Sequence, residues 1–158
     1  MRKIFLSAFV LLSLGLHAQD IESFLRIDSI TRAIDNAGYR IEHDTIRNDQ
    51  PELKLFMITY LTMISNGHEL KKYVNNVHIT RTENGETQQM ETTNIFYFDE
   101  GNLIKVEDLA TNGDKNFQAH WYYEKNKPLY ETPPTEESAE RSAMLLKIGQ
   151  TLLAKIHL

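Results

Sequence analysis

The chain has 158 residues, with 17 basic and 22 acidic side chains, a net charge of −5 and no cysteine. This length suits one ordinary domain with a core of its own. The acidic balance disfavours nucleic acid as a partner, and without cysteine the fold has neither disulfides nor a thiol nucleophile.

The first 18 residues have the pattern of a secretory signal peptide. Arg2 and Lys3 supply a basic start, residues 4–16 form an apolar run too short to span a bilayer comfortably, and Ala18 is a small residue at the expected cut. We therefore expect residues 1–18 to be removed and residues 19–158 to form a single domain.

Cleavage at this site would change the net charge from −5 to −7. The remaining chain has no second long apolar segment and no cysteine for lipid attachment. We expect an exported, soluble protein of the bacterial periplasm or the medium, with no transmembrane anchor after signal cleavage.

The segment from Asp20 to Ala37 has the apolar spacing of an amphipathic helix, and Gly38 is suited to end it. Its apolar residues recur at three- and four-residue steps: Ile21, Phe24, Leu25, Ile27, Ile30 and Ile34.

Short runs rich in aromatic and β-branched residues follow, separated by Asn-Gly and Glu-Gly pairs that favour tight hairpins. This pattern predicts an antiparallel meander. The strands are expected near residues 39–46, 54–65, 68–82, 86–99, 102–110, 115–124 and 128–131.

A second helix is expected after Pro133 and Pro134, with Thr135 as its N-cap. Its apolar stripe would be Leu145, Leu146, Ile148, Leu152, Leu153 and Ile156. The predicted class is α+β: an N-terminal helix, a curved antiparallel sheet of six or seven strands, and a C-terminal helix.

If Glu100-Gly101 is a two-residue loop, Phe98 lies opposite Leu103 and Phe96 lies opposite Lys105. Extending this register through Asn112-Gly113 assigns two faces. One collects Ile95, Tyr97, Ile104, Val106, Ala119 and Trp121. The other collects Phe96, Phe98, Leu103, Lys105, Glu107, Gln118, His120 and Tyr122.

Apolar residues on both faces indicate that both are covered at least in part. Either one helix packs on each side, or both pack on the Trp121 face and leave the Phe96 face as a groove. A one-residue slip would exchange the two sets of residues, and a bulge at Asn75-Asn76 could do so locally in the preceding strand.

No catalytic, nucleotide or metal motif accompanies these elements, so we assign no catalytic residue, cofactor or metal ligand. Lys105, Glu107 and His120 would share a face and could do acid–base work. The alternative is a cross-strand salt bridge beside a histidine.

We therefore expect a non-enzymatic binding or interaction module that uses the amphipathic sheet face. The partner would be a protein, a peptide or a small hydrophobic ligand. Its candidate contact residues are Phe96, Phe98, Leu103, Lys105, Glu107, His120 and Tyr122. The alternatives are a small hydrolase or isomerase with a pocket around Lys105, Glu107 and His120, and a structural component of the cell envelope.

Overall fold

The computed structural model describes residues 21–83, 85–132 and 138–156. The predicted signal peptide and the predicted N-cap Thr135 lie outside these ranges. Residues 21–36 form a helix, here called the N-terminal helix.

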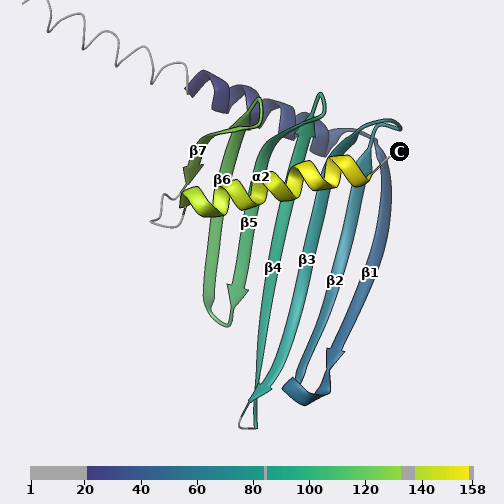
Figure 1. The fold of residues 1–158 in the computed structure, drawn as a ribbon, viewed down its shortest axis with the longest axis vertical. Helices are drawn as coiled ribbons and strands as arrows, with labels where there is room; N and C mark the ends of the chain where they lie inside the picture. Colours follow the sequence, from purple (N-terminus) through teal and green to yellow (C-terminus); the bar gives the residue numbers. More distant parts are fainter. Residues whose placement is uncertain (1–20, 84, 133–137, 157–158) are drawn as a thin grey trace, which may run out of the picture.

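Seven antiparallel strands follow in simple meander order, and one long helix closes the chain (Figure 1). The elements are β1 (Arg40–Gln50), η1 (Pro51–Leu53), β2 (Leu55–Ser65), β3 (Leu70–Glu83), β4 (Glu86–Asp99), β5 (Asn102–Asn112), β6 (Lys115–Glu124), β7 (Lys127–Thr132) and α2 (Ser138–Lys155). The sheet is open and curved, with β1 and β7 at its edges. The predicted fold class is confirmed.

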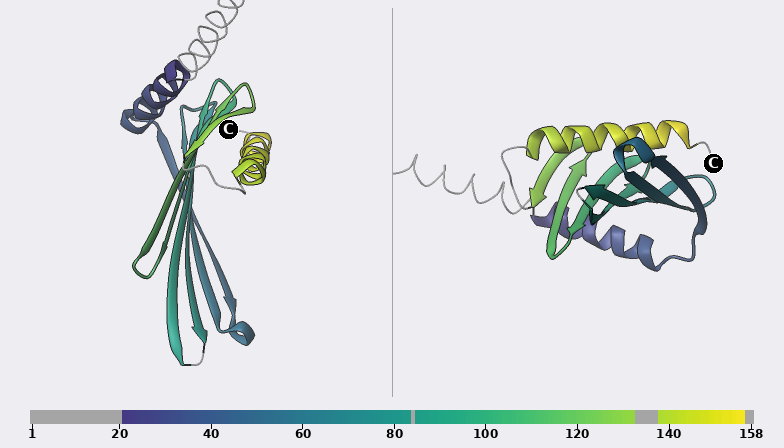
Figure 2. Two further views of the ribbon diagram at one scale, coloured as in Figure 1. Left: turned by 90° about the vertical axis from the view of Figure 1, so that its left-hand side faces the viewer. Right: turned by 90° about the horizontal axis from the view of Figure 1, so that it is seen from below.

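One helix lies on each side of the sheet, which decides between the two predicted arrangements (Figure 2). Both helices cross the strands near the end that is uppermost in Figure 1, so among the described residues no helix lies on either side of the lower part of the sheet. Within the described ranges, neither helix combines the length and apolar character needed to cross a bilayer.

The hairpin turns follow from residues that tolerate a positive φ. Glu100 and Gly101 have φ values of 49° and 71°, as the two central positions of a type I′ turn require. Lys125 and Asn126 do the same between β6 and β7, with φ values of 49° and 61°. The tight loop at Glu100-Gly101 was predicted and fixes Phe98 opposite Leu103.

The predicted register beyond this pair is wrong because β5 contains a bulge. Phe98 pairs with Leu103, but Tyr97 pairs with Lys105, so Ile104 is one residue in excess on β5. From this point on, each β5 side chain lies on the face opposite to the predicted one relative to β4. Phe96 therefore shares a face with Val106, and Tyr97 shares one with Lys105.

The hairpin between β5 and β6 also differs from the prediction, but this difference does not change the face on which each side chain lies. Its two-residue loop is Gly113-Asp114, so Val106 pairs with Trp121 rather than with Ala119. A displacement by two residues leaves every side chain on its face, because side chains alternate with a period of two. Lys105, Glu107, His120 and Tyr122 therefore still share one face, as predicted.

The main core lies between the sheet and α2. Buried side chains from the central strands meet Leu145 of the helix. The hydroxyl of Tyr123 donates to the backbone carbonyl of Ser142 at 3.0 Å, which satisfies a polar group inside this core. The buried members are Leu70, Phe96, Phe98, Leu103, Val106, Ala119, Trp121, Tyr123 and Leu145.

Gly149 lets α2 approach the sheet closely. A Cβ at this position would lie 2.9 Å from Cδ2 of Leu103, which is fully buried. We expect Gly149→Ala to lower the free energy of unfolding by about 1 kcal/mol. The reason is that overpacking costs about 1–3 kcal/mol and exceeds the gain of about 1 kcal/mol in helix propensity.

Urea denaturation would measure this change. Gln150→Ala, an exposed position on the same helix, is the matched control and should change stability by less than about 0.5 kcal/mol. A Gly149→Ala protein as stable as the parent would contradict the close approach.

Candidate functional site

The bulge divides the predicted contact residues between the two faces of the sheet. Phe96, Phe98 and Leu103 lie on the α2 side and are buried in the main core. The polar members of the set lie on the other side, beneath the N-terminal helix. The predicted single amphipathic face is thus replaced by two covered surfaces of different character.

Lys105 is the centre of a cluster of charges between the sheet and the N-terminal helix. Its ammonium donates to Oδ1 of Asp28 at 2.9 Å and lies 3.0 Å from Oε1 of Glu107. The Lys105 side chain is only 9% exposed, so this ammonium is largely removed from water. Two carboxylates near one ammonium offset its desolvation.

Tyr122 and Phe24 complete the contact with the helix. The hydroxyl of Tyr122 donates to the same Asp28 oxygen at 3.2 Å, and its ring lies 5.3 Å from the ring of Phe24. The Lys105 ammonium is 5.2 Å from the centroid of the Tyr122 ring, within cation–π range. Asp28 thus receives a charged and a neutral donor from neighbouring strands.

His120 lies at the margin of this cluster. Its Nδ1 is 3.7 Å from Oε1 of Glu107, and its Nε2 is 3.0 Å from the side-chain amide nitrogen of Gln118. If that amide donates to Nε2, the neutral ring carries its proton on Nδ1, which faces Glu107. Lys105, Glu107 and His120 are therefore brought together, as the sequence predicted.

The environment shifts the pKa values of two groups in this cluster. Burial by itself lowers the pKa of Lys105, but hydrogen bonds to Asp28 and Glu107 outweigh burial and raise it above its ordinary value. Burial raises the pKa of Tyr122, and the Asp28 carboxylate adds to this rise while Lys105 opposes it. Lys105 is therefore a stable cation and a poor proton acceptor at neutral pH.

A second ionic contact joins the N-terminal helix to the adjacent pair of strands, β3 and β4. Lys72 donates to Oδ1 of Asp35 at 2.6 Å, and the hydroxyl of Tyr97 donates to Oδ2 of the same carboxylate at 3.2 Å. Burial is the main cause that raises the pKa of Tyr97, with Glu107 and Asp35 contributing. The N-terminal helix is thus fixed to the sheet by two carboxylates spaced seven residues, or two turns, apart.

These contacts explain the charged trio as a means of attaching a helix. We expect Asp28→Asn to lower the free energy of unfolding by about 1–3 kcal/mol, since it leaves the buried Lys105 with one carboxylate. The value lies below that for a fully buried pair because the Asp28 side chain is 32% exposed.

Chemical denaturation of the variant would measure this loss, with Glu22→Gln on an exposed part of the same helix as the control. The control should change stability by less than about 0.5 kcal/mol. Equal stability of both variants and the parent would show that the Asp28 contact does not hold the helix.

A different surface becomes visible below α2, on the side of the sheet that carries the main core. Two rows of paired side chains run across the strands there, and we call them together the open face. The first row is Ile46, Thr59, Val77, Thr92, Ala110 and Phe117, and the second is Asn48, Met57, Ile79, Met90, Asn112 and Lys115. Lys115, at the end of the second row, is the only charged member.

The opposite side of the same strands exposes Phe56 and Tyr60 but is more polar, and its polar side chains have internal partners. His78 lies 3.8 Å from Glu91, and its ring packs edge-on against Tyr60. Asn76 donates to Glu91 and to Thr93, each at 2.7 Å. The two sides of the lower sheet therefore differ: one has a hydrogen-bonded network, and the other presents apolar and small polar side chains.

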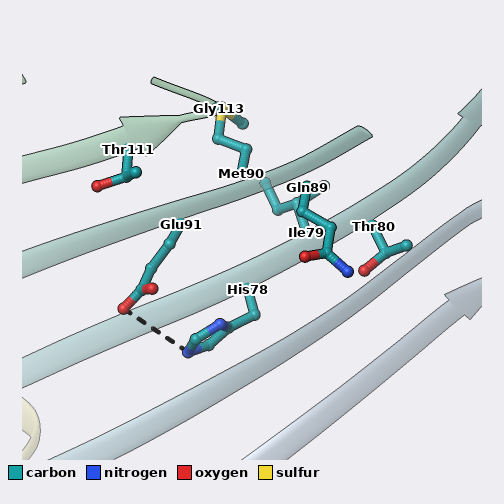
Figure 3. A pocket seen from close by; sticks show the side chains of 8 residues that line it. All are labelled: His78, Ile79, Thr80, Gln89, Met90, Glu91, Thr111 and Gly113. Carbon is teal, nitrogen blue, oxygen red and sulfur yellow. Dashed lines mark ion pairs between the residues drawn. The ribbon is translucent and has the colours of Figure 1, made fainter. Parts of the chain in front are cut away.

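A groove of about 340 Å³ lies beside β4 where its pairing with β5 begins, at Met90 opposite Asn112 (Figure 3). Its lining includes Ile79 and Met90 from the open face as well as His78 and Glu91 from the opposite side. Thr80, Gln89 and Thr111, which also line it, belong to the opposite side as well, so the groove lies mainly on that side, beside the β5–β6 hairpin.

No family model, curated protein or solved structure matches the chain, so its function has to be argued from its own residues. Among the described residues, no three histidine, aspartate or glutamate side chains gather in a way that could hold a metal ion.

The open face was not predicted from the sequence, because the predicted register covered only β4, β5 and β6. The pairing of Glu83 with Glu86 sets the register of the preceding hairpin and places Ile79 opposite Met90. No alternation on β2 reveals this surface, because the intervening residues Phe56, Ile58 and Tyr60 are also apolar or aromatic.

Proposed function

We propose that this protein is an exported, non-enzymatic interaction module, and that the open face is its binding surface. The observation that carries the proposal is the contrast between the two parts of one sheet. Its upper part is covered by a helix on each side, whereas its lower part presents two rows of largely apolar side chains in which only Lys115 is charged, and no helix of the described residues lies over them.

The composition of the open face is that of a contact surface. Methionine and aromatic residues are enriched, and charged residues depleted, at the centres of protein interfaces. Phe117 is 45% exposed, and Met90 and Ile46 are also exposed. Contiguous apolar surface rimmed by polar residues is typical of sites that bind another molecule.

The arrangement of the charged trio favours this function over a hydrolase or isomerase. The Lys105 ammonium is held by Asp28 and Glu107 beneath the N-terminal helix. Little of its surface is therefore accessible to a substrate. A general base needs access to the proton that it removes. The trio is better suited to hold the helix than to do acid–base work.

The proposal of export rests on the first 18 residues, whose basic start and apolar run have the pattern of a signal peptide. The absence of cysteine is compatible with an oxidising compartment, because the fold needs no thiol there.

Site-specific photo-crosslinking in the producing cells tests the binding surface. A photoreactive phenylalanine analogue replaces Phe117 on the open face or Tyr60 on the opposite side, and both native side chains are 45% exposed. We expect a discrete adduct from position 117 and none from position 60. No adduct at either position, or equal labelling at both, would contradict the proposal.

A further inference from the structure

We infer that a second copy of this chain docks on the open face, so that two lower half-sheets stack face to face around a two-fold axis. This inference rests on the proposed function, since it names the partner of that same surface. Stacked sheets lie about 10 Å apart, with the side chains of their facing surfaces interdigitated.

The distribution of charge suits a symmetric contact. In a two-fold interface, each residue near the axis meets itself or a close neighbour, so a charge near the axis would face a like charge. The centre of the open face is formed by Val77, Ile79 and Met90, which are uncharged. On the opposite side of the same strands, His78 and Glu91 occupy the corresponding centre.

The size of the surface is at the lower limit for a specific dimer. The two rows of the open face span six strands, and a third row, Gln50, Leu55, Arg81 and Gln88, borders them on β1 to β4 only. At about 4.8 Å between strands and about 6.8 Å between rows, these positions give a footprint of roughly 500 Å² per copy. A pair would bury about 1,000 Å², close to the minimum for a specific interface. The dimer should therefore be weak, with a Kd on the order of micromolar.

The edges of the sheet are less suitable for self-association. β1 is the long edge strand, and its charges are Arg40, Glu42, Asp44, Arg47 and Asp49. Charged side chains along an edge oppose the addition of another strand. β7 has only six residues and includes Pro128, which has no backbone donor.

The shape of the open face favours a protein over a small ligand. Small-molecule sites are concave and bury most of the ligand. The groove beside Ile79 and Met90 is lined mainly from the opposite side, by residues such as His78 and Glu91, so it provides no wall around the open face. Apart from Lys115 at its end, the open face is uncharged, and a sheet surface of this width can pack against another sheet.

Sedimentation velocity of the purified protein over roughly 1–300 µM, a range that brackets a micromolar Kd, tests the inference. We expect the weight-average mass to rise with concentration from one copy of the chain toward two. Ile79→Lys should abolish this rise, because it buries an ammonium at the axis of the dimer. His78→Lys, the adjacent residue on the opposite side, should dimerise like the parent.

Circular dichroism establishes that both variants are folded, and Phe117→Lys provides a second open-face variant at an exposed position. A chain that stays monomeric throughout, or equal loss of dimer in Ile79→Lys and His78→Lys, would overturn the inference. A monomeric chain whose position 117 still forms an adduct with a different protein would overturn the dimer and leave the proposed function standing.

Discussion

The extra residue in β5 is the constraint on which the rest of the structure depends. Leu103 pairs with Phe98, and Lys105 pairs with Tyr97, so Ile104 reverses the alternation between the two central strands. The reversal brings Phe96 and Val106 together beneath α2, and it brings Lys105 beside Tyr97 beneath the N-terminal helix. Without it, the lysine and its carboxylate partners would share a surface with the aromatic core, where charges are costly.

The two helices are consequently held by different interactions. α2 packs through Leu145 and approaches Leu103 closely at Gly149, so its attachment is mainly apolar. The N-terminal helix adds Asp28 and Asp35, which receive donors from the sheet. Each helix crosses the upper ends of the strands, and neither of these two described helices covers the lower ends. The open face is thus a result of strands that are longer than the helices can cover.

Much of this fold could be predicted from the sequence, because turn residues and hydrophobic periodicity are local signals. Glu100-Gly101 fixed a hairpin correctly, and the elements lie close to their predicted ranges. The bulge could not be predicted, since an extra residue such as Ile104 leaves no local pattern and is stabilised by the helices packed on each side. The grouping of Lys105 with Glu107 and His120 was correct, because a shift by two residues preserves the face. The burial of this group depends on a contact with Asp28. Because Asp28 is far away in the sequence, local patterns do not reveal this contact.

The central claim is that α2 covers only the upper part of its side of the sheet. Because the chain has no cysteine, a single introduced thiol reports on one position. Ala119 is buried beneath α2, whereas Ala110 belongs to the open face on the neighbouring strand. In dilute, monomeric protein, Ala110→Cys should react readily with a thiol reagent and Ala119→Cys should be protected. Equal reaction rates at the two positions, or protection at position 110, would contradict the account.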